Sequence, residues 1–205
     1  MVSSELSSRG PGAGRRKQSV VVVVGNPRPG SRTAALAGEL AGVVAGLVGA
    51  EEPQVLDLAE LTEELGAPLG SGSGERWAGP LRALHAADLL IIATPTYKGS
   101  YTGLLKSFLD HVGGGALHGI VAVPLTTVGS PAHTLAAEVH LRPLLIELGA
   151  STPTSALVVG GDLLDDPTAA IKPWLEHNAD QLARALSPAP ALTGVTTFST
   201  GVATT

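Results

Sequence analysis

Unbroken apolar runs alternate with longer segments of mixed polarity along this chain. Val20–Val24 is a run of five valines, and Asp88–Ala93 reads DLLIIA. Runs of β-branched and aliphatic residues are typical of strands that are covered on both faces of a sheet. The longer segments between the runs have the length and composition of helices. The pattern therefore predicts a parallel sheet with helices packed on it.

The predicted elements follow one another from residue 20 to residue 186. We expect strands at Val20–Val24, Gln54–Leu58, Asp88–Ala93, Ile120–Leu125 and Pro153–Val159. We expect helices at Ala34–Ala50, Ala59–Leu65, Arg76–Ala87, 104–112, Ala132–Leu148 and Thr168–Leu186, with a loop at Gly66–Gly74. The predicted fold class is α/β, a three-layer sandwich whose five-stranded parallel sheet has Val20–Val24 at its centre.

The predicted helix Ala34–Ala50 is almost entirely apolar and carries a glycine at every fourth residue. Gly38, Gly42 and Gly46 form this stripe. Such stripes also occur in helix dimers in membranes, but Glu39 interrupts the run and the segment is short for a bilayer. We therefore expect the glycines to let the helix lie close to the sheet, at some cost in helix propensity.

Composition narrows the class of protein. The 205 residues suffice for one domain with a sizeable core, and the net charge of −5 does not favour nucleic acid or a membrane as partner. The absence of cysteine excludes disulfides, thiol redox chemistry and thiolate metal sites. The apolar run that stops at Gly25 is too short for the core of a signal peptide, so we expect a cytoplasmic protein.

The two ends of the chain differ in composition from the rest. Residues 1–18 are rich in serine, glycine and arginine without periodicity, and we expect them to be disordered. Residues 187–205 form a tail rich in proline, alanine and threonine, to which we assign no structure. The folded domain is therefore expected over residues 19–186.

The stretch that follows the valine strand, 25–33 or GNPRPGSRT, is the first candidate binding site. Its prolines and glycines predict a turn, and Ser31 or Thr33 can cap the next helix. A helix N-terminus favours anions, and Arg28 and Arg32 add two guanidiniums. The lysine of a P-loop and the glycines of a dinucleotide fingerprint are absent. We prefer a phosphate site over the alternative, a surface turn with solvated arginines.

Two further loops, 94–103 and 126–131, also follow buried strands. The carboxyl ends of parallel strands meet at one edge of a sheet, and ligands bind there. We therefore expect these loops to lie beside the phosphate turn.

Three stretches of the sequence resemble the NADPH-dependent FMN reductases with a flavodoxin-like fold. They are GNPRPGSRT, TPTYKGSYTGLLKSFLDHV and TTVGSPAHTLAAEVHLRPLLIELGA, in the order and with the spacing of that family. The resemblance covers about residues 19–160 and is strongest to the branch that supplies reduced FMN to two-component alkanesulfonate-type monooxygenases. The sequence departs from the family at Asn26, where serine is usual, and at Val128, where glycine is usual.

The resemblance implies a flavodoxin-like fold with an FMN site built from these loops. The first loop would hold the phosphate, Pro95–Gly99 would lie along the isoalloxazine, and the N–H groups of residues 127–129 would stabilise the reduced flavin. The expected cofactor-binding residues are Asn26, Arg28, Ser31, Arg32, Thr33, Pro95, Thr96, Tyr97, Lys98, Gly99, Thr127, Val128 and Gly129.

The function implied is that of an NAD(P)H:FMN oxidoreductase, with NADPH or NADH as hydride donor and a flavin-dependent monooxygenase as possible partner. Hydride transfer needs no proton relay, so we expect no catalytic side chain. We expect no metal site, because no ligand set surrounds His133 and His140. The alternatives are an FMN-containing quinone, azo or metal-ion reductase, a flavodoxin-type electron carrier, and a scaffold without flavin.

The resembling reductases form dimers or tetramers through the helices at 104–112 and 132–148. Both helices have more apolar residues than one sheet face can cover, so we expect a homodimer or homotetramer. The resemblance implies a local irregularity in the second helix at the family's tetramer contact, where Val139 and His140 stand in place of a more usual aromatic neighbourhood. The apolar residues in question are Leu104, Leu105, Phe108 and Leu109 on the first helix, and Leu135, Val139, Leu141, Leu144 and Leu145 on the second.

Overall fold

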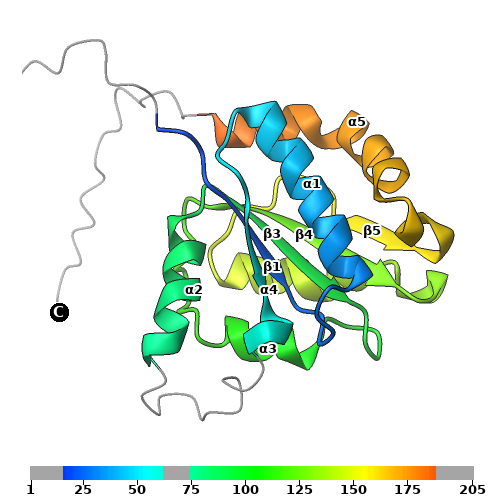
Figure 1. Ribbon diagram of the computed structural model, residues 1–205, viewed down its shortest axis with the longest axis horizontal. Helices are drawn as coiled ribbons and strands as arrows, with labels where there is room; N and C mark the ends of the chain where they lie inside the picture. The colour runs from blue at the N-terminus through cyan, green and yellow to red at the C-terminus, as the bar shows by residue number, and fades with distance from the viewer. Residues whose placement is uncertain (1–15, 62–73, 188–205) are drawn as a thin grey trace, which may run out of the picture.

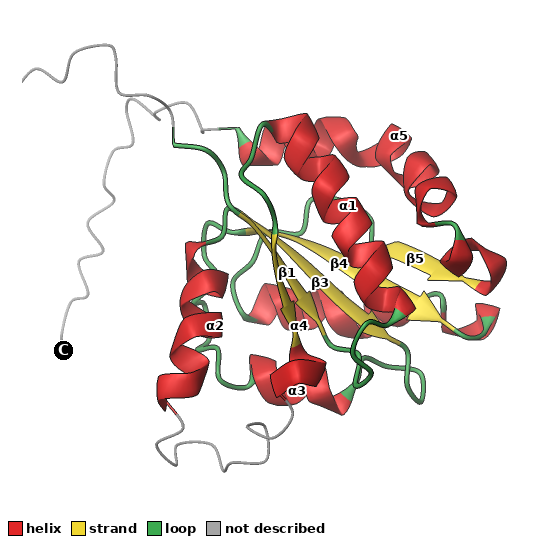
Figure 2. Ribbon diagram, viewed as in Figure 1, coloured by secondary structure: helices red, strands yellow, loops and turns green. Residues whose placement is uncertain are grey.

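The computed structural model describes residues 16–61 and 74–187. The sheet, drawn as yellow arrows in Figure 2, has five parallel strands in the order β2-β1-β3-β4-β5. This is the flavodoxin-like strand order, so the predicted α/β fold with a five-stranded parallel sheet is confirmed. The strands are β1 (Val20–Val24), β2 (Gln54–Asp57), β3 (Leu89–Pro95), β4 (Val121–Val128) and β5 (Leu157–Gly160).

β1 is an interior strand but not the central one. It pairs with β2 on one side and with β3 on the other. β3 has two strands on either side, so the prediction that places Val20–Val24 at the centre is wrong by one position. The reason is that β1 and β3 are both buried along their whole length, and burial alone does not distinguish their order.

Helices cover both faces of the sheet (Figure 1). Alternate valines of β1 enter the two cores, since Val22 packs among the residues of α1 and α5 while Val23 packs among those of α3 and α4. All five valines are at most 2% exposed, which explains why the run shows no polar alternation. The helices are α1 (Arg32–Val48) and α5 (Pro167–Leu186) on one face, and α2 (Gly74–Ala86), α3 (Gly103–Leu109) and α4 (Arg142–Glu147) on the other.

The glycine stripe of α1 faces away from the sheet. Gly42 and Gly46 are exposed, and a Cβ built on either would meet no atom within 4 Å. The prediction that these glycines allow close packing is therefore wrong. A second stripe of small residues, the alanines at every fourth position of the buried face, lies against the sheet instead. The buried face consists of Thr33, Leu36, Ala37, Leu40, Ala41, Val44 and Ala45.

β3 and β4 are longer than predicted, and β5 is shorter than the predicted Pro153–Val159. β3 and β4 remain paired up to Pro95 and Thr127, so the first residues of two predicted loops belong to strands. β5 pairs with β4 only over Leu125–Val128. Pro124, the residue before this stretch, has no N–H to donate, which is one reason why β5 does not extend further.

The predicted helix Ala132–Leu148 is divided into separate turns. A 3₁₀ turn, η2 (Pro131–His133), and a π turn, η3 (Ala137–Leu141), precede α4. Pro143 near the start of α4 cannot donate to the carbonyl of Val139, and its ring disfavours a regular α-helix there. The π turn lies where the resemblance implied an irregularity.

Glu138 and Arg142 fasten the π turn to the segment before β5. The Arg142 guanidinium donates to both carboxylate oxygens of Glu138, and to the carbonyls of Thr152 at 2.9 Å and Thr154 at 2.8 Å. The N–H of Ala156 donates to Glu138 at 2.9 Å. The bond from Arg142 holds the pKa of Glu138 below its ordinary value, against the opposing effect of partial burial. This backbone is bonded to side chains, which is a second reason why β5 is short.

The apolar face of α3 is covered within one copy of the chain. Leu105, Phe108 and Leu109 are at most 1% exposed, and Leu104 packs partly buried against the same core. A Cβ on Gly25 would lie 2.6 Å from the Cβ of Leu105, so the missing side chain makes room for the helix. The prediction that these residues form an uncovered patch is therefore wrong.

Several predicted segments lie outside the described residues. They are most of the terminal segments 1–18 and 187–205, most of the loop Gly66–Gly74 and the end of the predicted helix Ala59–Leu65. The described start of that helix is a 3₁₀ turn, η1 (Leu58–Leu61). None of the helices in the described ranges has the length and apolar character needed to cross a membrane.

Candidate active site

The turn after β1 is shaped by Asn26 and Ser31. The Asn26 Oδ1 accepts a hydrogen bond from the N–H of Arg28 at 3.0 Å, which closes the turn. Ser31 is the N-cap of α1, because its Oγ accepts from the N–H of Ala34 at 3.2 Å. The helix begins at Arg32, so the first of the two predicted caps is the one used.

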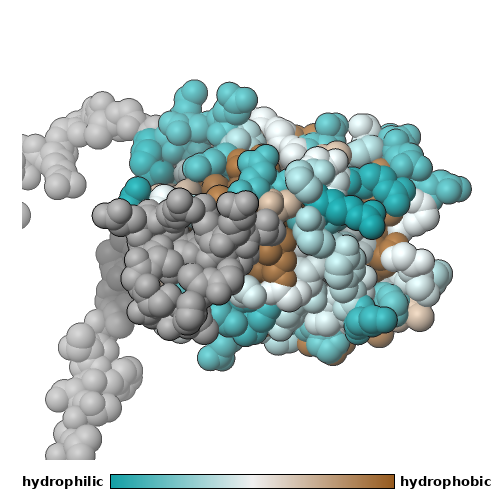
Figure 3. Space-filling model, turned by 60° about the horizontal axis from the view of Figure 1, so that its bottom comes forward, coloured by the Kyte–Doolittle hydropathy of each residue, from teal (hydrophilic) through white to brown (hydrophobic). Residues whose placement is uncertain are grey.

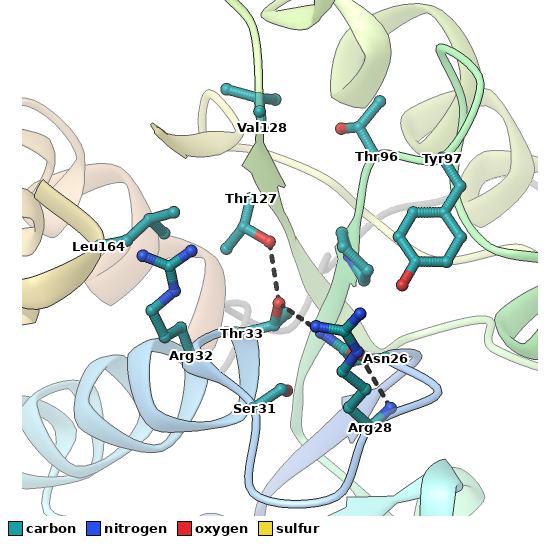
Figure 4. A pocket seen from close by; sticks show the side chains of 12 residues that line it. Asn26, Arg28, Ser31, Arg32, Thr33, Thr96, Tyr97, Thr127, Val128 and Leu164 are labelled. Atoms are coloured by element: carbon teal, nitrogen blue, oxygen red, sulfur yellow. Dashed lines mark hydrogen bonds between the residues drawn. The ribbon is translucent and has the colours of Figure 1, made fainter. Parts of the chain in front are cut away.

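Thr33 connects this turn to β4 (Figure 4). Its Oγ1 lies 2.8 Å from the Oγ1 of Thr127 and accepts a hydrogen bond from the Nδ2 of Asn26 at 3.2 Å. The three residues are at most 8% exposed. Their side-chain polar atoms are bonded to one another or to backbone, so they fix the end of β1, the start of α1 and the end of β4 relative to each other.

The loop after β3 ends in a tight turn. Tyr97 and Ser100 exchange two backbone hydrogen bonds, of 2.8 and 3.1 Å, around Lys98 and Gly99. These two central residues have φ values of 53° and 80°, as in a type I′ turn, and a lysine adopts this conformation at a cost. The N–H of Thr96 donates to a carbonyl of β4 at 2.8 Å, which holds the loop beside that strand.

Thr102 joins the far end of the same loop to the first turn. Its Oγ1 donates to the carbonyl of Gly25 and accepts from the N–H of Leu105 at 3.1 Å, as the N-cap of α3. Its own N–H donates to the Oγ1 of Thr94 at 3.2 Å. The first two loops are therefore held together by buried hydrogen bonds as well as by strand pairing.

These loops surround a cavity of about 400 Å³ at the carboxyl edge of the sheet, a size typical of small-molecule sites. Every predicted site residue lines it except Lys98 and Gly99, which form the tip of the turn. Leu164, from the 3₁₀ turn η4 (Gly161–Asp165), lines it without having been predicted. The only clue to Leu164 is its position, because η4 directly follows β5 at the same edge of the sheet. The lining is Asn26, Arg28, Ser31, Arg32, Thr33, Pro95, Thr96, Tyr97, Thr127, Val128, Gly129 and Leu164.

One end of the cavity is positively charged. Arg28 and Arg32 line it and are exposed, whereas the lining contains no aspartate or glutamate. In the described ranges no carboxylate forms an ion pair with Arg28, while the Nη1 of Arg32 lies 3.4 Å from the Oδ1 of Asp165. The first N–H groups of α1 have no partner inside the helix and add a partial positive charge. This end is suited to an anion such as a phosphate.

A buried polar atom lies at the other end. The Oγ1 of Thr96 is buried and has no hydrogen-bond partner in the part of the chain that the structure describes. A buried hydroxyl without a partner costs free energy, so a ligand with a polar group is expected to supply one. The ring of Tyr97, which is 46% exposed, offers an aromatic surface nearby.

The lining offers little acid–base chemistry of its own. It contains no histidine, carboxylate, lysine or cysteine. Among the described residues, no three histidine, cysteine, aspartate or glutamate side chains lie close enough together to hold a metal ion, and this includes His133 and His140. The arrangement suits an anionic ligand that brings its own reactivity.

Comparison with protein families identifies the chain. The family model described as NADPH-dependent FMN reductase matches residues 19–163. The chain belongs to this family. The match begins just before β1 and ends within η4, so it includes the loops after β1, β3 and β4 and the first part of η4.

Two bacterial FMN reductases illustrate the similarity. NADH-dependent FMN reductase SfnF from Pseudomonas putida is 34% identical over 152 residues, which are 71% of this chain and 79% of that protein. FMN reductase (NADPH) from Escherichia coli (strain K12) is 49% identical over 67 residues, a match that spans 33% of this chain and only 35% of that protein.

A solved relative has the same architecture. The apo form of the NADH:FMN oxidoreductase EMOB superposes with a TM-score of 0.70 at 33% identity, and the superposition covers 85% of this chain and 92% of that one. The fold expected from the FMN reductase family is therefore present over most of the chain.

Proposed function

We propose that the protein is an NAD(P)H:FMN oxidoreductase that binds FMN in the cavity at the carboxyl edge of the sheet. The observation that carries the proposal is the joining of a cationic helix N-terminus and two flanking loops around one hollow of about 400 Å³. FMN has a phosphate at one end and a planar ring at the other, and the cavity offers groups for both. Membership of the FMN reductase family supports the same ligand and the same reductant.

Arg28, Ser31 and Arg32 would hold the phosphate together with the first N–H groups of α1. Arg28 is the strongest candidate, because it is exposed and forms no ion pair with a described carboxylate. Asn26 and Thr33 have side chains already hydrogen-bonded within the protein. We assign these two residues the role of keeping the turn in shape, which leaves the backbone N–H of Thr33 for the ligand.

Residues of the second and third loops would hold the flavin ring. Pro95, Thr96 and Tyr97 supply one wall, and the Thr96 hydroxyl gains the partner it lacks. Residues 127–129 supply the other wall, with backbone N–H groups available near the place where the ring becomes negative on reduction. Lys98 and Gly99 form the tip of the same turn, outside the lining of the cavity.

When bound, FMN supplies the hydride-accepting chemistry, and NADPH or NADH supplies the hydride. The protein contributes binding, orientation and exclusion of water. The cavity lining has no histidine or carboxylate, which suits a reaction that needs no proton relay. We therefore assign no catalytic side chain.

The test mixes the purified protein with FMN and NADPH, and separately with NADH, in the absence of oxygen. We expect loss of the visible flavin absorbance at a rate proportional to protein concentration, and its return when air is admitted. The ratio of the two rates identifies the preferred donor. A protein that binds FMN and leaves both nicotinamides unoxidised would contradict the proposal and indicate a flavodoxin-type carrier.

We propose further that the protein acts in the cytoplasm, and that reduced FMN leaves it and serves a flavin-dependent monooxygenase. The likeness of the three loops to the two-component branch supports this, as do Arg28 and Arg32, whose exposure leaves the phosphate end accessible to solvent. Desalting protein that has been loaded with FMN should remove the flavin. Flavin retained in equal amount to protein would identify a prosthetic group and contradict the release.

We propose that the chain forms a homodimer, or a homotetramer built from it, through the segment from η2 to α4. Leu135, Val139 and Ile146 in this segment are large apolar residues with exposures of 68%, 58% and 55%. Figure 3 shows one polar face of the molecule interrupted by apolar patches. A second copy placed over the exposed residues of the segment would remove them from water. Residues 19–186 are the proposed FMN-binding unit of each copy.

A further inference from the structure

The two arginines of the phosphate turn differ in their surroundings. Arg32, the first residue of α1, forms an ion pair with Asp165, the last residue of η4, with an Nη1–Oδ1 distance of 3.4 Å. Arg28 has no such partner among the described carboxylates. Leu164, next to Asp165 in the chain, lies beside the Arg32 side chain at the cavity (Figure 4). A carboxylate outside the cavity lining is therefore paired with one of the two arginines at the positively charged end of the cavity.

The other acidic residues of this segment have different positions. Asp166 caps α5, because its carboxylate accepts from the N–H of Ala169 at 3.0 Å. Asp162 is an exposed residue of the same 3₁₀ turn and forms no ion pair with a described residue. Asp165 alone of the three is bonded to a group that lines the cavity.

An ion pair of this kind acts on the affinity for a phosphate in two ways. The carboxylate occupies one side of the Arg32 guanidinium, which otherwise is available for bidentate bonding to phosphate. The carboxylate also repels the phosphate directly. The Arg32 and Asp165 side chains are 64% and 72% exposed, so the effect is moderate and sensitive to salt.

We infer that Asp165 is an affinity-setting residue that weakens FMN binding by holding Arg32. This inference rests on the proposed function, because it concerns the same phosphate end of the cavity. Weakened binding is useful in a reductase whose product leaves as reduced FMN for another enzyme. Asp165 should therefore affect the affinity for FMN, which carries a phosphate, and not the affinity for riboflavin, which carries none.

The experiment compares the full-length protein with Asp165→Asn and with the matched control Asp162→Asn. Titration of flavin fluorescence gives the Kd for FMN and for riboflavin. We expect Asp165→Asn to bind FMN about three- to fivefold more tightly at low salt, the size expected for an exposed ion pair. Its affinity for riboflavin and both affinities of Asp162→Asn should equal those of the wild type.

A double-mutant cycle with Arg32→Gln tests whether Asp165 acts through Arg32. In the Arg32→Gln background, Asp165→Asn should change FMN affinity much less than in the wild type. In the protein that keeps Arg32, the gain in FMN affinity caused by Asp165→Asn should also shrink as salt is added. An equal gain in both backgrounds, an equal gain in Asp162→Asn, or a gain for riboflavin as well would overturn the inference.

The result separates this inference from the proposed function. If the wild type binds FMN and oxidises NAD(P)H but the Kd of Asp165→Asn is unchanged, the role of Asp165 is contradicted and the proposed function is not. Wild-type protein that binds no FMN would remove both.

Discussion

Val128 occupies the space beside β5 that a side chain at residue 160 would need. The two residues are partners in the parallel pairing of β4 and β5. A Cβ built on Gly160 would lie 2.7 Å from the carbonyl oxygen of Val128 and 2.8 Å from its Cγ2. Val128 is 6% exposed and lines the cavity. The larger residue at the cavity is thus accommodated by the absence of a side chain on the neighbouring strand.

This relationship predicts that Gly160→Ala destabilises the protein. Residue 160 has φ −149°, which any residue can adopt, so the cost is steric and not conformational. We expect the free energy of unfolding to fall by about 1–3 kcal/mol, measured by urea denaturation. Adding Val128→Gly should recover only part of the loss, because the carbonyl contact stays. Unchanged stability in Gly160→Ala would show that β5 moves freely away from β4.

Gly42→Ala should have the opposite effect. The residue lies in the middle of α1, is exposed and has free space where a Cβ would be. Alanine is a better helix former than glycine, so we expect the free energy of unfolding to rise by about 0.5–1 kcal/mol. Gly149→Ala serves as the contrast, since φ is +95° and a Cβ there would lie 2.9 Å from the backbone of Gly115. A destabilised Gly42→Ala would mean that another molecule packs on this stripe.

The sequence could predict most of the cavity lining because the lining is carried by consecutive residues at the ends of buried strands. The segment 25–33 needs only the valine run before it and the helix after it to be read as an anion turn. The parallel arrangement then brings the other loops to the same edge. Leu164 was not predicted, because an isolated leucine in an irregular turn has no feature in the sequence that indicates a binding site.

Contacts between residues that are far apart in the sequence could not be predicted from local sequence patterns. Thr33 and Thr127 are 94 positions apart in the sequence. Because their side chains are hydrogen-bonded, the Thr33 hydroxyl holds the start of α1 beside β4. The order of β1 and β3 in the sheet is likewise a property of the assembled fold. The π turn has a local cause in Pro143, but its anchor to Thr152 and Thr154 through Arg142 does not.

Arg28→Ala tests the phosphate end of the proposed FMN site. A charged hydrogen bond to phosphate contributes about 1.5–3 kcal/mol, so FMN binding should weaken by this amount. Riboflavin has no phosphate, and its affinity should barely change. Fluorescence titration measures both, with Arg184→Ala on the exposed surface of α5 as a control for loss of one positive charge. Equal losses for FMN and riboflavin would show that Arg28 does not contact phosphate.

Glu138 predicts a dependence of stability on acid pH. Its pKa is lowered in the folded protein by the bond from Arg142, so the folded state binds a proton less readily than the unfolded chain. The stabilisation is therefore complete at neutral pH and is lost as pH falls below the ordinary value of 4.5 and through the lowered pKa. Other carboxylates also make the stability depend on acid pH, and a comparison of the wild type with Glu138→Gln removes their contribution.

Glu138→Gln should lower the free energy of unfolding at neutral pH by about 1–2 kcal/mol, a value reduced for the partial exposure of the pair. The difference between variant and wild type should shrink on acidification, because the wild type then loses the same charge. Glu147→Gln, an exposed residue of α4, is the matched control and should change little. Urea denaturation at several pH values measures this. A difference that stays constant into acid would contradict the lowered pKa.

The last prediction concerns the proposed contact between copies. Val139 lies in the π turn and is 58% exposed, and Leu135 and Ile146 are exposed in the same segment from η2 to α4. Burying a lysine charge in an apolar contact is costly, so Val139→Lys should shift the protein to monomers at concentrations where the wild type is dimeric or tetrameric. Leu47→Lys, on the exposed side of α1 and 61% exposed, is the control and should leave the mass unchanged. Light scattering over a dilution series measures both. A wild type that is monomeric at every concentration, or a Val139→Lys protein with unchanged mass, would contradict this interface and would require another partner for the three apolar side chains.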